Sequence, residues 1–139
     1  MKTNRNSKTK KSIIDVYETI YDVDIVVANE YTTIDQLNKK YCSIDGSDLT
    51  EQDCTAFTQK CYNRTTDKAS IVIKYCSTPE HVQDKKSYII NTAAHEALHA
   101  CMYIYSRIGE DVYKSDSNEL FAYLIGWLTE RIYNTFTKK

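Results

Sequence analysis

Residues 87–108 read SYIINTAAHEALHACMYIYSRI, and this stretch decides how the rest of the chain is arranged. It contains neither proline nor glycine, the two residues that most disfavour a helix interior. Small and apolar side chains recur along it at the spacing of a buried helix face. Gly109 follows, and glycine is common just past a helix end. We therefore expect one long, largely buried helix from about Ser87 to Arg107.

The centre of this helix holds the sequence His95-Glu96-Ala97-Leu98-His99. Histidines four residues apart project from the same helix face one turn apart, so their imidazoles can converge on one ion. Burying two histidines and a glutamate without partners would cost several kcal/mol, and a metal would supply the partner. We predict that His95 and His99 bind one zinc ion per chain.

A catalytic zinc ion normally takes three protein ligands and leaves the fourth position to water. Glu119 is the best candidate for the third ligand, because it begins the next predicted helix and lies one short loop away from the first. Asp116 and Glu119 also resemble a capping box, in which the glutamate only satisfies backbone N–H groups. We favour the ligand over the cap because of the two histidines upstream.

The composition is that of one soluble globular domain, since 139 residues with 42% hydrophobic and 27% charged residues suffice for a single core. Residues 1–12 hold five basic residues and no acidic one, and we expect a disordered basic arm there, followed by a single domain over 13–139. The remaining 13 basic and 19 acidic residues give a charge of −6, which disfavours nucleic acid as the main partner. No secretory signal or membrane-spanning stretch is evident, so we expect a cytoplasmic protein without a membrane partner.

The N-terminal half is predicted to form a small sheet. Residues 13–21 have helical spacing, residues 23–28 are rich in β-branched side chains, and a short helix capped at Thr32-Thr33 runs to Tyr41, before a turn at Asp45-Gly46. The segments 55–62 and 70–75 flank a polar stretch and read as an antiparallel pair. A second long helix is expected over about 117–136. The fold class is α+β, a small, mainly antiparallel N-terminal sheet packed on two long C-terminal helices.

The five cysteines are expected to be free buried thiols, because their number is odd and no pair has Cys-x-x-Cys spacing. A bridge between Cys54 and Cys61 stays open as an alternative.

His95-Glu96-Ala97-Leu98-His99 followed by Ser117-Asn118-Glu119 resembles the gluzincin clan of zinc metallopeptidases, to which thermolysin belongs. The run 119–124, ELFAYL, is also similar to the helix of small phage-encoded and mobile-element metallopeptidase-like proteins, some of which cleave repressors. The resemblance covers residues from about 71 to 130. It implies a minimal zincin-like fold, a zinc cofactor, and a protein or peptide substrate.

The resemblance further implies that an edge strand pairs with the extended substrate backbone, and the segment expected in that place is Ile71, Val72, Ile73, Lys74 and Tyr75. The chain departs from the family in two respects. Tyr123 stands where such enzymes often have a carboxylate that orients a zinc ligand. The large second domain that forms the other wall of the cleft in thermolysin is also missing.

Glu96 would act as the general base that takes a proton from the attacking water and passes it to the leaving amine. A further donor is needed for the developing oxyanion, and the sequence does not rank the candidates Tyr103, Tyr113, Tyr123 and His81. Two other hypotheses stay open. The first is a zinc-binding regulatory or protein-interaction module without peptidase activity. The second is a metal-free helical packing module, in which the two histidines are core residues.

Overall fold

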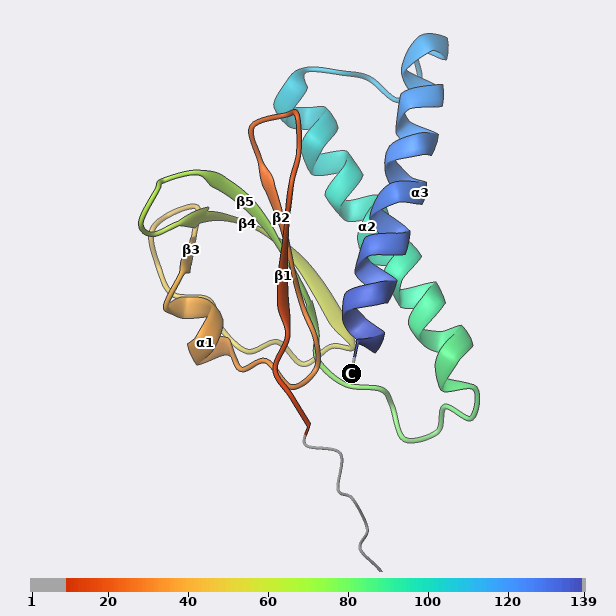
Figure 1. The fold of residues 1–139 in the computed structure, drawn as a ribbon. Coiled ribbons are helices and arrows are strands. Elements are labelled where there is room, and N and C mark those ends of the chain that lie inside the picture. The colour runs from red at the N-terminus through yellow and green to blue at the C-terminus, as the bar shows by residue number, and fades with distance from the viewer. Residues whose placement is uncertain (1–9, 139) are drawn as a thin grey trace, which may run out of the picture.

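The computed structural model describes residues 10–138, and the side chains of all of these except 115–117. Most of the predicted basic arm, residues 1–9, therefore lies outside the described residues. The fold is α+β, as predicted: a five-stranded sheet from the N-terminal part packs against two long C-terminal helices (Figure 1). The helices are α2 (Lys85–Ile108) and α3 (Ser115–Thr137), and they lie side by side as an antiparallel hairpin on one face of the sheet (Figure 1).

The sheet has the strand order β1-β2-β5-β4-β3. Its strands are β1 (Ile14–Glu18), β2 (Asp24–Ala28), β3 (Tyr41–Ser43), β4 (Ala56–Asn63) and β5 (Ala69–Tyr75). Only the central pair β2 and β5 is parallel, and the other three pairings are antiparallel. The prediction of a mainly antiparallel sheet, with 55–62 and 70–75 as partners, is thus confirmed.

The helix predicted over residues 13–21 was wrong, because this segment forms β1 and a turn. A nine-residue stretch of mixed apolar residues fits both the helical period of 3.6 residues and the strand period of two. The segment that it packs against then decides which of the two structures forms. The neighbouring strand β2 supplies that partner through the register Ile14↔Ala28 to Glu18↔Asp24. Tyr17 then points towards α3, where its ring packs edge-on against Trp127 with the centroids 6.2 Å apart.

Helix α2 begins two residues before the predicted Ser87 and ends one residue after the predicted Arg107, directly before Gly109. The side chain of Asp84 accepts a hydrogen bond from the backbone N–H of Ser87 at 3.1 Å and so caps the first turn. Gly109 has φ of 71° and terminates the helix in the left-handed conformation that glycine adopts without strain. The buried faces of α2 and α3 form the main core with the facing side chains of β2 and β5.

The opposite face of the sheet carries a smaller core under the short helix α1 (Ile34–Asn38) and the loop that follows β3. Helix α1 opens with the predicted cap, in which Thr33 and Gln36 form a reciprocal capping box. It ends at Asn38, so Tyr41 belongs to β3 and not to the helix as predicted. Neither α2 nor α3 has, within the described residues, an apolar stretch that would let it cross a membrane.

Candidate metal centre

His95 and His99 lie together on the exposed flank of α2, so the expectation that both histidines are buried was wrong, and only Glu96 is buried. Their Nε2 atoms are 3.2 Å apart, and their ring centroids are separated by 4.9 Å. Two nitrogens that each bind a tetrahedral zinc ion at about 2.0–2.1 Å stand about 3.3 Å from each other. The imidazole pair therefore has the spacing that two ligands of one zinc ion require, and both side chains are open to solvent.

Glu96 occupies the neighbouring position and is buried against β4. Its side chain is only 4% exposed, although a carboxylate is rarely buried without a partner. The partner is Thr58 on β4, whose hydroxyl donates a hydrogen bond of 2.5 Å to Glu96 Oε2. Because α2 lies along β4, the strand holds the glutamate in place at the level of the histidine pair.

A pocket of about 240 Å³ opens beside this carboxylate. It is lined by residues from the start of β4 and from one flank of α2: Thr55, Ala56, Tyr88, Asn91, Thr92, His95 and Glu96. The hydroxyls of Tyr88 and Thr55 are 2.8 Å apart and hydrogen-bonded, which ties the helix to the strand at this end. The pocket thus brings a carboxylate, an imidazole, an amide and a phenol into one partly enclosed space.

Glu119, the predicted third ligand, does not join the pair. Phe121 packs on Tyr105, which lies six residues beyond His99 and so about 9 Å farther along α2. Because the hairpin is antiparallel and its loop is short, the start of α3 lies beside the end of α2 and not beside its middle. Within the part of the chain that the structure describes, no three His, Cys, Asp or Glu side chains are grouped so as to hold a metal ion.

The four predicted oxyanion candidates also lie away from this pocket. Tyr113 and Tyr123 are 90% and 72% exposed, and His81 is an exposed residue of the loop before α2. Tyr103 is half-buried one turn after His99, and the ammonium of Lys60 lies 4.9 Å above its ring. The tyrosine that does line the pocket, Tyr88, was missed because nothing in its sequence position distinguishes it from the other eleven.

The predicted edge strand requires a correction. Strand β5, with Ile71, Val72, Ile73, Lys74 and Tyr75, pairs with β2 on one side and β4 on the other and is the central strand of the sheet. Its backbone groups therefore have partners on both sides, and it cannot pair with a substrate. The almost uninterrupted apolar run of this strand is typical of a central position, and that signal was available in the sequence.

An open edge exists on β4 instead. Strand β3 pairs only with residues Cys61–Asn63 of β4, so the first part of β4 has no strand on that side within the described residues. Thr55 O accepts a hydrogen bond from Cys76 N at 2.7 Å, which fixes which residues face β5. Along an antiparallel pair of strands, residues that bond to the partner strand alternate with residues that direct their N–H and C=O groups away from it. On β4 the residues of the second kind are Ala56, Thr58 and Lys60, and their backbone groups face the open side. Thr58 is the residue that holds Glu96.

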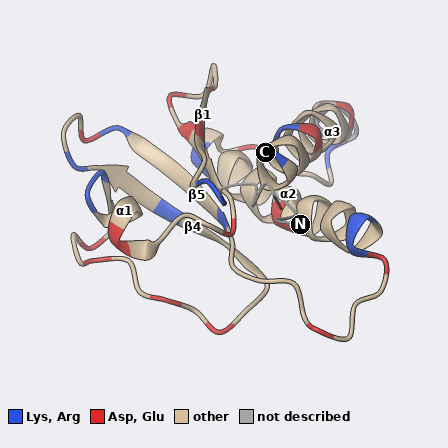
Figure 2. Cartoon of the chain, turned by 60° about the horizontal axis from the view of Figure 1, so that its bottom comes forward, with Lys and Arg blue, Asp and Glu red and all other residues tan. Residues whose placement is uncertain are grey.

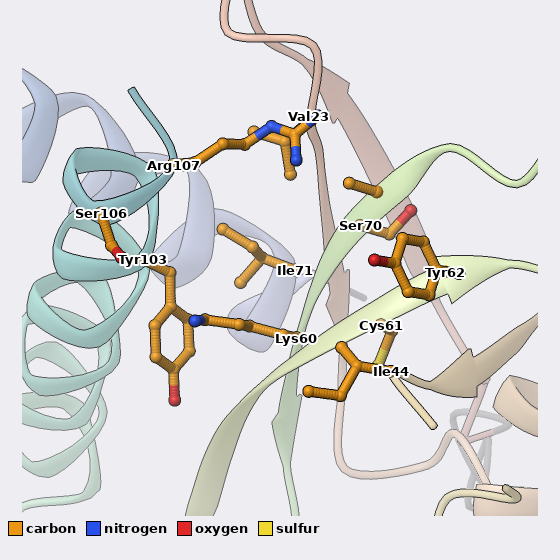
Figure 3. A pocket seen from close by; sticks show the side chains of 11 residues that line it. Val23, Ile44, Lys60, Cys61, Tyr62, Ser70, Ile71, Tyr103, Ser106 and Arg107 are labelled. Atoms are coloured by element: carbon orange, nitrogen blue, oxygen red, sulfur yellow. The ribbon is translucent and has the colours of Figure 1, made fainter. Parts of the chain in front are cut away.

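A second pocket, of about 310 Å³, lies farther along the same flank of α2 (Figure 3). Tyr103 and Arg107 from the helix face Lys60 and Tyr62 from β4 across it, and Ile71 forms its floor. Arg107 also donates hydrogen bonds to the carbonyls of the β1–β2 turn. The flank of α2 that bears the histidines is therefore hollowed towards both ends of the helix.

The cysteines are all free thiols, as predicted, and the alternative of a Cys54–Cys61 bridge is not formed. Only Cys61 and Cys101 are buried, whereas Cys42, Cys54 and Cys76 are half-buried, so the prediction of burial holds for two of the five. Burial raises the pKa of Cys101 to about 12. Burial, helped by the nearby Cys42, likewise raises the pKa of Cys61 to about 12. Neither thiol is suited to bind a metal or to act as a nucleophile, because both reactions use the thiolate.

Comparisons of the chain with known protein families, with curated proteins and with solved structures found no match. The gluzincin resemblance thus rests on the motif residues alone and stays a prediction. The histidine pair fits two ligand positions of a zinc ion, whereas the third protein ligand is not placed among the described residues. Thr58 is the neighbour that sequence reasoning missed, because its contact with Glu96 spans 38 residues of chain.

Proposed function

We propose that this protein is a zinc-dependent peptidase whose centre is formed by His95, Glu96 and His99. The observation that supports the proposal is the 3.2 Å spacing of the two Nε2 atoms beside a buried glutamate that faces a pocket. A core histidine pair would be buried and hydrogen-bonded to other groups, whereas both of these imidazoles are exposed. The metal-free packing module gives no reason for that arrangement.

Zinc, when bound, supplies a Lewis acid that polarises a carbonyl and lowers the pKa of water to about 7. Glu96 accepts the proton of the attacking water at its carboxylate and returns it to the leaving amine. Thr58 positions this carboxylate through its hydroxyl and keeps it from rotating towards solvent. Tyr88 and Asn91, which line the same pocket, are the donors available to a developing oxyanion, in place of the three tyrosines expected from the sequence.

The substrate in this proposal is an extended peptide that adds to the open edge of β4 at residues 56–60. Such β-augmentation uses the backbone groups that Ala56, Thr58 and Lys60 direct outwards. A peptide in that place passes below the histidine flank of α2, because Thr58 marks the level of Glu96. The role first assigned to the central strand thus moves to β4.

The second candidate function is a zinc-binding module that recognises a partner without cleaving it. The observation in its favour is that only two protein ligands come together within the described residues. Two histidines hold zinc less firmly than the three ligands of a typical catalytic site. Both candidates predict zinc binding, and they differ in whether Glu96 has a chemical role.

The test combines zinc content with cleavage of a degenerate peptide library, read by mass spectrometry, for wild type and two variants. Glu96→Gln keeps the shape of the side chain and the Thr58 contact but cannot accept the proton. Glu119→Gln is the matched control, since it makes the same change on an exposed glutamate away from the histidine pair. Zinc is measured per chain after dialysis against metal-depleted buffer with added zinc.

We expect the wild type and Glu119→Gln to bind zinc and to cleave the same peptides. We expect Glu96→Gln to bind zinc and to lose cleavage by a factor of about 100 or more, because general-base catalysis contributes that much. Cleavage by Glu96→Gln at the wild-type rate would contradict the proposal. Zinc binding without any cleavage would leave the binding module, and absence of zinc binding would rule out both.

A further inference from the structure

Lys74 is a lysine inside the protein, on the face of the sheet opposite to α2. It is only 4% exposed and lies in β5 between Ile73 and Tyr75, both fully or almost fully buried. A buried ammonium ion costs several kcal/mol unless an opposite charge accompanies it. A methionine of similar length would fill the same space without that cost, so the packing of the strand does not explain the lysine.

The ammonium has two partners, and both are neutral. Lys74 Nζ donates to the backbone oxygen of Asn29 at 2.9 Å and to that of Tyr75 at 2.6 Å. An ammonium group has three N–H donors, so one of them has no partner among the described residues. None of the ion pairs in the described part of the chain includes Lys74. Burial lowers the pKa of this lysine, although Cys76, Glu30 and Glu51 act in the opposite direction through their charge at longer range.

A pocket of about 330 Å³ adjoins the lysine. Its wall comprises the segment from the end of β2 to the start of α1, part of the loop before β4, and Cys76. Gln52 on that loop is exposed and contributes an amide that can donate to an oxygen inside. The pocket therefore has a cation at its inner wall and a neutral donor near its mouth.

Two carboxylates, Glu30 and Glu51, line this pocket. The loop between β3 and β4 has three further acidic residues (Figure 2), but they are not part of the lining, and Asp48 is paired with Arg64 at 2.6 Å. Glu51 lines the pocket and is exposed, whereas Glu30, on the opposite wall, forms a long ion pair with Lys85 at 3.7 Å. A ligand with one negative charge at its inner end and one positive charge at its outer end matches this distribution.

We propose that this pocket binds a small amino acid-like zwitterion. Its carboxylate accepts the free N–H of Lys74 and the amide of Gln52, and its amino group lies near Glu51. A plain carboxylate satisfies Lys74 but is repelled at the mouth, and a plain amine leaves the buried ammonium without its counter-charge. This site is on the other face of the sheet from the histidine pair, and it is independent of the peptidase proposal.

The test uses three sets of probes in carboxylate-free buffer, with binding measured by calorimetry and by thermal shift. The first set is glycine, β-alanine and γ-aminobutyrate, which carry both charges. The second set is acetate, propanoate and butanoate, which lack the amine, and the third is the amides of the three amino acids, which lack the carboxylate. The proteins are wild type, Lys74→Met, Glu51→Gln, and Lys60→Met as a control for loss of a lysine elsewhere.

We expect at least one amino acid to bind the wild type more tightly than its matching plain acid, and its amide not to bind. Lys74→Met should weaken that binding about tenfold or more, because a charge-assisted hydrogen bond is lost. Lys60→Met should leave it unchanged. Glu51→Gln changes an exposed residue and does not endanger folding. It should tighten the binding of the plain acid and reduce the preference of the pocket for the amino acid.

Three results would overturn the proposal. The first is the absence of binding by every probe at about 10 mM, where even a millimolar Kd would be visible. The second is equal binding of the amide and the acid, since Lys74 would then have no role. The third is unchanged plain-acid binding in Glu51→Gln, which also serves as the decisive measurement if Lys74→Met fails to fold.

Discussion

The hydrogen bond between Thr58 and Glu96 can be tested by its effect on stability, without any assay of activity. Thr58→Val removes the hydroxyl and keeps the branched shape, which leaves a carboxylate that is 4% exposed without its partner. A hydrogen bond to a charged group contributes about 1.5–3 kcal/mol, so we expect a loss of about 2 kcal/mol. For a domain of this size the melting temperature should fall by roughly 7 °C.

A double-mutant cycle separates this bond from ordinary packing at the same position. Glu96→Leu removes the buried charge, and we expect it to be neutral or stabilising by itself. In that background Thr58→Val should cost less than about 0.5 kcal/mol, so that the coupling between the two sites is about 1.5–2 kcal/mol. Urea unfolding followed by the fluorescence of Trp127, the only tryptophan, gives these values. An equal cost of Thr58→Val in both backgrounds would show that the hydroxyl does not stabilise the Glu96 carboxylate.

The remaining predictions concern the metal, acid stability and the thiols. His95→Ala should weaken zinc binding by about 100-fold or more in a calorimetric titration, because one imidazole alone is a poor site. Burial by itself raises the pKa of Asp15, but hydrogen bonds from Thr135 and Lys138, together with the charge of Lys138, outweigh it and hold this pKa below its usual value. Asp15 therefore stabilises the fold above about pH 4, and this stabilisation is lost as the pH falls through the lowered pKa. In urea unfolding, the free energy of unfolding of Asp15→Asn should depend less on pH below about pH 4 than that of the wild type. Cys61, Cys76 and Cys101 should resist iodoacetamide at pH about 8 in the native protein, because burial raises their pKa values to about 12, about 11 and about 12. The half-buried Cys42 and Cys54 should react, as read by peptide mass spectrometry.

The long elements could be predicted because each depends on its own residues. The run 87–108 has no helix breaker and has a glycine behind it, and the helix indeed extends from Lys85 to Ile108. The strand 23–28 and the pair around residues 63–68 also have local signals, a β-branched run and a polar turn. The first strand could not be predicted in this way, because its partner β2 and its contact with Trp127 lie outside it.

The candidate site could be predicted only as far as one helix extends. The spacing of His95 and His99 follows from helix geometry, and the structure places their Nε2 atoms 3.2 Å apart. The position of Glu119 depends on how two helices and a loop pack, which its sequence distance from His99 does not determine. The prediction that residues 71–75 form an edge strand was wrong for the same reason, since the order of strands in a sheet is a property of the whole chain.

Among the residues that the structure describes, one glutamate and one lysine break the rule that charges lie outside, and each adjoins a pocket. Glu96 is buried between α2 and β4, and Lys74 is buried on the other face of the same sheet. Each costs free energy that an apolar residue of the same size would save, so replacement of either should not destabilise the protein. Local sequence rules tend to fail at functional sites, because there the requirement of the ligand outweighs that of the fold. Stabilisation of the chain by both Glu96→Leu and Lys74→Met, with loss of cleavage in one and of ligand in the other, would give this argument its strongest support.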